Sequence, residues 1–207
     1  MDSYTTLKEL FEYRFEDRKS VFIGYAMPIK TESDALDFIA SVKKKYPDAR
    51  HWVYAYVLRE NSVMRYTDDR EPQGTAGMPV LDAIRKNGVT DAVIVVVRYF
   101  GGILLGTGGL VHAYSEAALG ALRGAKIIKY DTYSVVSASI SYSDYQKITS
   151  IMNEYDFYAE NTEYTDDVKI KGSIRSDRYG EFSKKIAEAT SGRANLNLLD
   201  EIYDFRE

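Results

Sequence analysis

Hydrophobic and polar positions in the first part of the chain predict strands and helices in mixed order. Residues 19–29 (KSVFIGYAMPI) are typical of a strand, and residues 13–16 are placed to pair with it. A helical period follows, which Thr31 or Ser33 can cap and Pro47 ends. Its expected apolar face consists of Ala35, Leu36, Ile39, Val42 and Tyr46.

The middle of the chain combines a predicted hairpin, a buried strand and two further helices. Residues 51–59 (HWVYAYVLR) and 62–68 (SVMRYTD) are β-rich runs separated by a short break. A short helix is expected to begin at Pro79 and to close at Gly88. Residues 91–97 (DAVIVVV) predict a strand that is apolar on both faces. Residues 110–123 (LVHAYSEAALGALR) predict a helix with small residues on one face and Gly124 as its C-cap.

The last part of the chain has a more regular rhythm. It predicts a strand over residues 133–140, a helix over 143–155 that Ser143 caps, and a hairpin of two strands over 157–164 and 168–175. A helix over 177–190, with Phe182 and Ile186 facing inward, and a strand over 194–205 follow. This βαββαβ order is that of a ferredoxin-like sandwich. The predicted fold class is therefore α+β, with two domains over residues 1–127 and 128–207.

Composition and charge limit the kinds of partner. With 45% hydrophobic and 28% charged residues, the chain has enough apolar material for a buried core. The net charge of −4 is uneven. Residues 1–127 carry 17 Lys and Arg against 16 Asp and Glu, whereas residues 128–207 carry 10 against 15. Neither half has the strongly basic balance of a protein that binds nucleic acid by charge alone, so RNA contact requires a local patch.

Several classes of site and location are disfavoured directly. The chain has no cysteine, which excludes disulfides, thiolate metal sites and a cysteine nucleophile. No apolar run approaches the ~20 residues of a membrane helix. The first residues also lack the basic and apolar regions of a signal peptide. We therefore expect a cytoplasmic protein without a membrane partner.

Two glycine-rich segments carry the candidate chemistry. Residues 68–77 (DDREPQGTAG) supply Arg70, Gly74, Thr75 and Gly77, and residues 98–109 (RYFGGILLGTGG) supply Gly101, Gly102, Gly106, Gly108 and Gly109. Each is expected to be a loop leading into a helix, where unpaired N–H groups and the helix dipole attract anions. The two loops either cradle phosphates or simply make tight turns. Neither matches the Walker A or the dinucleotide-binding pattern.

Arg98 ends the predicted buried strand, directly before the glycines. An arginine there can bind phosphate with two parallel hydrogen bonds. Alternatively, it pairs with an acid of the first segment and holds the two glycine-rich segments together. Tyr99 and Phe100 follow on opposite sides of the strand, so either one can stack on a base while the other fills the core.

The remaining polar candidates are weaker. Asp68, Asp69 and Glu71 are close enough in sequence to share a Mg²⁺ ion, but hydrogen bonds to loop amides account for them equally well. His112, in the first turn of the long helix, is a candidate for the anion site or for a general base. Because no catalytic arrangement surrounds it, we assign no catalytic residue, metal or cofactor, and the sequence favours a non-enzymatic protein.

At these residues the chain resembles a known family. RKSVF (18–22), TDDREPQGTAGMPVL (67–81) and VVVRYFGGILLGTGGLVHAYSEAA (95–118) are similar to the motifs of the bacterial YigZ branch of the IMPACT family. The resemblance implies an N-terminal domain like ribosomal protein S5 domain 2 and a ferredoxin-like C-terminal domain like the last domain of elongation factor G. It also implies a link to translation, since eukaryotic members regulate translation by binding the activator of an initiation-factor kinase.

Three positions depart from the family pattern. Arg70 replaces a glycine, His51 is followed by Trp52 and Val53 instead of asparagine and cysteine, and His112 replaces an arginine. Loss of that arginine weakens a permanently charged anion site, which Arg70 would restore.

Three functions remain open from the sequence. The first is a protein bound to RNA or the ribosome, in which the glycine-rich segments and Arg98 hold phosphates and Tyr99 or Phe100 stacks on a base. The second is a protein-interaction regulator that binds no nucleic acid. The third is a small-molecule phosphate or nucleotide enzyme. We favour the first.

Overall fold

The computed structural model describes residues 3–206 and divides into two compact units. One contains residues Tyr4–Lys129 and the other Tyr130–Arg206, so the boundary falls inside one strand, β7 (Ile127–Ile140). Within residues 3–206, no helix is both long and apolar enough to span a membrane.

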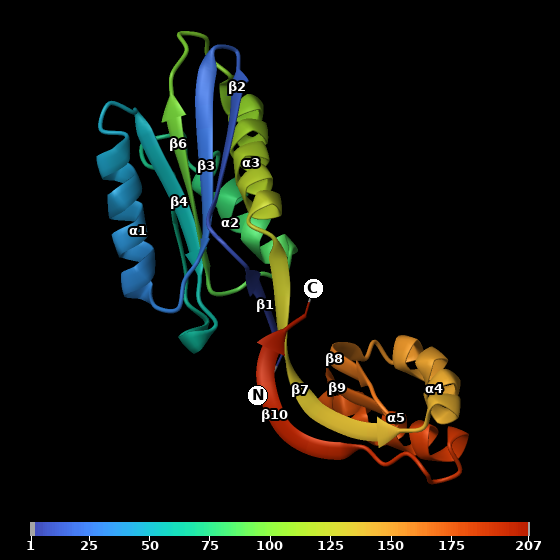
Figure 1. Cartoon of the computed structure of the whole chain (residues 1–207). Helices are drawn as coiled ribbons and strands as arrows, with labels where there is room; N and C mark the ends of the chain where they lie inside the picture. Colours follow the sequence, from blue (N-terminus) through green and yellow to red (C-terminus); the bar gives the residue numbers. More distant parts are fainter. Residues whose placement is uncertain (1–2, 207) are drawn as a thin grey trace. The chain divides into compact units, whose positions relative to one another are not determined.

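The N-terminal unit is built on an antiparallel sheet with the strand order β2-β3-β6-β4-β5 (Figure 1). Its central strand β6 is buried along almost its whole length, as the apolar run predicted. The elements of this unit are β1 (Tyr4–Leu7), β2 (Phe11–Asp17), β3 (Ser20–Pro28), α1 (Glu32–Lys45), β4 (His51–Val57), the 3₁₀ turn η1 (Glu60–Ser62), β5 (Met64–Thr67), α2 (Gly77–Lys86), β6 (Ala92–Tyr99) and α3 (Gly106–Gly124).

Helices cover both faces of this sheet (Figure 1). α1 packs on one face through Ala35, Ile39 and Val42, against alternate residues of β3 and β6. α2 and α3 pack on the other face. The backbone of α3 can approach β3 closely because Gly24 has no side chain, and a Cβ there would come within 2.4 Å of the Ala117 carbonyl oxygen. Two separate cores therefore hold β6 from both sides, which fixes the position of its last residues.

The C-terminal unit contains the remainder of β7 followed by α4 (Tyr142–Glu154), β8 (Tyr158–Tyr164), β9 (Val168–Arg175), α5 (Ser176–Ala189) and β10 (Asn197–Phe205). Its strands pair antiparallel in the order β10-β7-β9-β8. Both helices pack on one face of the sheet, where Phe182 and Ile186 are fully buried. The predicted α+β class and ferredoxin-like order are confirmed.

Several local details differ from the prediction. Leu36 is 51% exposed, because the buried face of α1 passes through Ala35 and Ile39 and leaves Leu36 beyond its edge. The N-cap of α4 is Ser141 rather than Ser143, since the Ser141 hydroxyl accepts a hydrogen bond from the Asp144 amide. Thr31 caps α1 with a reciprocal capping box, as one of the two predicted alternatives.

Gly124 is not the left-handed cap of α3. It is the last helical residue, and Lys126 takes the left-handed conformation with φ 58°. Glycine is needed at 124 for space, because a Cβ there would lie 2.1 Å from the ring of Phe11. The helices also begin earlier than predicted: α2 at Gly77 instead of Pro79, and α3 at Gly106 instead of Leu110. Gly106, Gly108 and Gly109 are thus part of the first turn of α3.

Candidate functional site

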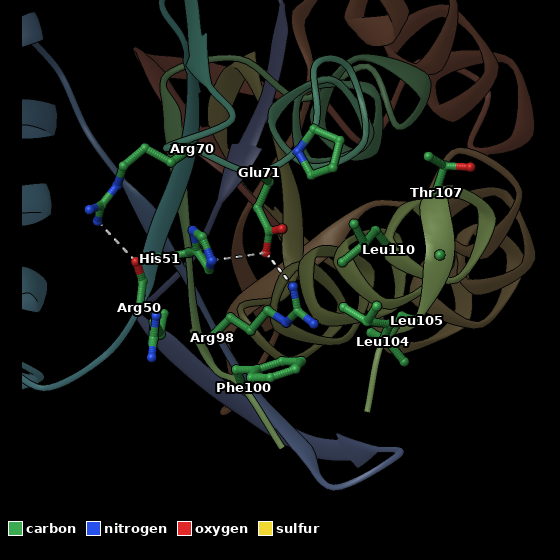
Figure 2. Close-up of a pocket in the computed structure, with 12 residues that line it drawn as sticks. Arg50, His51, Arg70, Glu71, Arg98, Phe100, Leu104, Leu105, Thr107 and Leu110 are labelled. Atoms are coloured by element: carbon green, nitrogen blue, oxygen red, sulfur yellow. Dashed lines mark hydrogen bonds and ion pairs between the residues drawn. The ribbon is translucent and has the colours of Figure 1, made fainter. Parts of the chain in front are cut away.

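A pocket of about 370 Å³ lies at the end of β6, between the first glycine-rich segment and the start of α3 (Figure 2). Strand pairing positions its polar side. In the register of β4 and β6, His51 lies opposite Arg98, and the Arg50 amide donates to the Arg98 carbonyl oxygen at 3.2 Å. Residues that are almost 50 positions apart in the chain therefore meet at this edge.

Arg98 and Glu71 form a buried ion pair beside the pocket. Arg98 Nη1 lies 2.6 Å from Glu71 Oε1, and the two side chains are 6% and 5% exposed. The Tyr114 hydroxyl donates to the same oxygen at 2.7 Å, and His51 Nε2 lies 3.7 Å from it (Figure 2 shows the contacts of Arg98 and His51). Burial, together with the charge of Glu71, raises the pKa of Tyr114, so its hydroxyl stays protonated as a donor. This network joins β6, α3 and the first glycine-rich segment.

Glu71 leaves part of the Arg98 guanidinium unpaired. Nε is buried and has no hydrogen-bond partner in the described part of the chain. Two aromatic rings flank the group, with the guanidinium carbon 5.4 Å from the centre of Phe22 and 5.7 Å from that of Phe100. A buried N–H without a partner is rare in native proteins and costs about 1–3 kcal/mol, so this donor can take an acceptor from outside the chain.

The carboxylate of Asp68 occupies the N-terminus of α2. Its two oxygens accept hydrogen bonds from the amides of Gly74, Ala76 and Gly77 at 2.8–3.1 Å. An anion from within the chain therefore already uses the amides of the first glycine-rich segment. Gly74 and Gly77 are accordingly placed for turn geometry and close packing, with Gly74 at φ 75°.

The three weak metal candidates point to different partners. Asp68 binds the α2 amides, Asp69 Oδ2 accepts from the Trp52 amide at 2.7 Å, and Glu71 pairs with Arg98. Within residues 3–206 there is no cluster of three acidic or histidine side chains arranged to bind a metal ion.

Arg70 lies on the rim of the pocket with its backbone in the left-handed region at φ 71°. This conformation is easiest for glycine, which explains physically why the family pattern has glycine here. The Arg70 side chain is exposed and donates to the Arg50 carbonyl oxygen at 3.0 Å. Arg50 is also exposed, so two cations border the pocket opening.

The rest of the pocket lining is largely apolar. It is formed by Pro72, Phe100, Leu104, Leu105 and Leu110, with Gly106 and Thr107 at the start of α3. No side chain in the described part of the chain caps that end of α3, so its first amides keep their anion-attracting character. Leu104 is 81% exposed and Phe100 43% exposed, which leaves both free to contact a ligand.

Other predicted site residues lie elsewhere. Tyr99 packs into the α1-side core against Tyr46, so of the two aromatic residues only Phe100 lines the pocket. Thr75 is buried and donates to the Pro72 carbonyl oxygen. His112 is exposed and does not line the pocket.

The glycines that follow Phe100 shape the loop before α3. A Cβ at Gly101 would come within 2.0 Å of the Lys19 backbone, and Gly102 has φ 84°. Gly108 and Gly109 lie in the first turn of α3 but do not line the pocket, whereas Gly106 does.

The pairing of Arg98 with an acid of the first glycine-rich segment was one of the two predicted alternatives, and Glu71 is that acid. The roles of Arg50, His51 and Tyr114 at this site were not predicted, and the apolar wall was predicted only as part of a loop and a helix. One signal was available: if the two apolar strands at 51–57 and 92–99 pair antiparallel, His51 falls at the end where Arg98 lies. The bond from Tyr114 to Glu71 had no such signal.

Comparison with known proteins connects these segments to a family. The Impact N-terminal domain matches residues 18–122, which include the pocket, and a domain of unknown function (DUF1949) matches residues 139–193. A crystal structure of a hypothetical protein, 32% identical, superposes with a TM-score of 0.60 over 97% of this chain and 98% of that one.

Relatives with both parts are found in bacteria. The IMPACT family member YvyE of Bacillus subtilis is 33% identical over 95% of this chain and 91% of its own length. YigZ of Escherichia coli (strain K12) is 33% identical over 90% and 93%. Protein IMPACT of Bos taurus is 30% identical over 46% of this chain and 31% of its own length. The chain therefore belongs to the IMPACT family.

Proposed function

We propose that this protein binds RNA through the pocket region of its N-terminal unit, without catalysis, and acts on the translation machinery in the cytoplasm. The observation that carries the proposal is the charge of the pocket. Three arginines line it against the Glu71 carboxylate, with the Asp69 carboxylate 3.9 Å from Arg70, and the start of α3 adds the positive end of a helix dipole. This is the local basic patch that a chain with a net charge of −4 needs for RNA contact.

Two features favour RNA over a simple inorganic anion. Phe100 exposes an aromatic ring beside the cations, and stacking of bases on such rings is a common means of holding single strands. The exposed arginines Arg50 and Arg70 lie where they can follow a phosphate backbone along the rim. Arg98 contributes less to phosphate binding, because Glu71 already neutralises it.

A salt titration tests the proposal. Binding of a fluorescent mixed-sequence single-stranded RNA is followed by anisotropy at several salt concentrations. Each arginine that neutralises a phosphate contributes about −0.7 to the slope of log K against log salt. We therefore expect Arg50→Ala and Arg70→Ala each to weaken binding and to reduce the magnitude of this slope by about 0.7.

Arg85→Ala is the matched control. It removes the same charge from an exposed position in the last turn of α2, outside the pocket. An equal loss of slope in this control would mean that only overall charge matters. No RNA binding even at low salt would refute the proposal.

A protein partner is the second candidate function. The loop that follows β6 exposes Phe100, Ile103 and Leu104 within five residues of the chain, and exposed apolar groups of this kind often belong to protein interfaces. Retention of a defined protein by the wild type but not by Leu104→Ser, together with absence of RNA binding, would favour this candidate.

A further inference from the structure

The arginine in the pocket interior is buried and paired with an acid, whereas the arginines at the rim are exposed, and this difference narrows the class of ligand. Arg98, the buried arginine of the pocket, is paired with the buried carboxylate of Glu71 at 2.6 Å, whereas Arg50 and Arg70 are exposed. A phosphate pushed to the depth of Arg98 would meet the Glu71 carboxylate in a poorly solvated environment, which is unfavourable. The interior therefore suits an uncharged group.

The walls of the interior suit a flat, largely apolar ring. Leu105 and Leu110 are buried in the lining, and Phe100 and Leu104 are exposed beside them. A volume of about 370 Å³ is near the lower end of the range of small-ligand sites, ~300–1,000 Å³, and has room for a single nucleotide unit. Bases of single-stranded RNA are commonly taken out of the stack and held in this manner.

The unpaired part of Arg98 selects among bases. Its Nη1 is bound to Glu71, which leaves Nε without a partner and Nη2 without a hydrogen bond to the described part of the chain. In Figure 2, the free terminal nitrogen of Arg98 lies on the side away from Glu71, toward Leu104 and Leu105. A guanidinium with only donors on its free edge requires two adjacent acceptors, and the O6 and N7 atoms of guanine are the commonest such pair.

We infer that the pocket captures one unpaired guanine base, with its O6 and N7 atoms on the free edge of Arg98 and its ring against Phe100. The attached phosphate then lies at the rim with Arg50 and Arg70. Nε is buried in the ligand-free protein, so side chains around it must move to admit the base. Side-chain changes are common at binding sites. The inference rests on the proposed RNA-binding function, and the guanine could belong to an RNA strand or to a free nucleotide.

The test uses the wild-type protein and three short oligouridylates that differ only in one central base. The first carries guanosine, the second 7-deazaguanosine, which lacks the N7 acceptor, and the third adenosine, which replaces the O6 acceptor with a donor. We expect the adenosine strand to bind about 5- to 150-fold more weakly than the guanosine strand, with 7-deazaguanosine in between. Guanosine monophosphate and adenosine monophosphate, titrated alone, separate the free nucleotide from the RNA source.

Two kinds of variant test which arginine determines the preference for guanine. Arg98→Lys keeps a cation for Glu71 but loses the planar fork, so we expect the affinity of the guanosine strand to fall to that of the adenosine strand. Arg50→Ala and Arg70→Ala should weaken all three strands equally and leave the preference intact. Emission of Trp52, the only tryptophan, verifies that the N-terminal unit of each variant is folded.

These measurements distinguish a failure of the guanine inference from a failure of the proposed RNA binding. Equal binding of the three strands overturns the guanine inference while RNA binding stands. Binding of guanosine monophosphate with the same preference, without RNA binding, supports the guanine site and refutes the RNA function. A preference that survives in Arg98→Lys overturns the role of Arg98, and no binding of any probe refutes both.

Discussion

Removal of the Glu71 carboxylate should destabilise the N-terminal unit strongly. In Glu71→Ala, Arg98 loses an ion pair at 2.6 Å between side chains that are almost fully buried, and the Tyr114 hydroxyl loses its acceptor at 2.7 Å. Breaking a buried pair by deleting one partner costs about 3–5 kcal/mol, because the remaining charge is left uncompensated. That is a large fraction of the ~5–15 kcal/mol that stabilises a typical domain.

Urea unfolding followed by Trp52 emission measures this effect. Trp52 is the only tryptophan and its indole donates to the Tyr46 carbonyl oxygen within the N-terminal unit, so its signal reports on that unit alone. With a denaturant slope of about 2 kcal/mol per M, the expected loss lowers the midpoint by about 1.5–2.5 M. Far-ultraviolet circular dichroism should show a separate transition of the C-terminal unit that does not move.

A double-mutant cycle decides whether the charge pairing is the cause. Arg98→Met alone leaves Glu71 unpaired and should be similarly costly. Glu71→Gln is measured alone and combined with Arg98→Met. The combination removes both charges and keeps an acceptor for Tyr114, so the double variant should be more stable than the sum of these two single effects predicts. The role of the charge pairing would be refuted if each single variant lost less than about 1 kcal/mol of unfolding free energy, or if the two losses were additive within about 0.5 kcal/mol.

Three further predictions follow from backbone geometry and titration. Arg70→Gly relieves a left-handed residue at φ 71° and should leave stability unchanged or raise it by up to about 1 kcal/mol in urea unfolding, whereas Arg70→Ala should not raise it. Gly101→Ala, whose Cβ would lie 2.0 Å from the Lys19 backbone, should cost about 1–3 kcal/mol, while Gly108→Ala, with open space around it, should be neutral or stabilising in the same assay. Burial and a carboxylate hydrogen bond raise the pKa of Tyr56 to about 12, so the unfolded chain releases this proton first and stability should fall as pH rises from about 10 to 12. Tyr56→Phe should reduce that alkaline loss in thermal unfolding, and an unchanged pH profile would contradict the assignment.

The sequence alone determined most of the secondary structure and the ferredoxin-like order of the second part. The reason is local: period-2 and period-3.6 patterns, and a cap such as Thr31, depend on residues a few positions apart. The special geometry of residues 68–77 and 98–109 was also visible, because glycine frequency marks turns and close approaches. Helix starts were less well determined, since Gly106 and Gly108 are poor helix formers that tertiary packing holds in α3.

Only the tertiary structure decided what the polar residues do. Whether Arg98 binds an external phosphate or an internal acid depended on Glu71, 27 positions away, and on Tyr114, 43 positions beyond Glu71. The same holds for Asp68, whose carboxylate fills the start of α2 and so uses the amides that the sequence offered to a ligand. Hydrogen bonds and ion pairs require side chains to meet within about 3 Å, and strand register and helix packing set such distances, which no local pattern encodes.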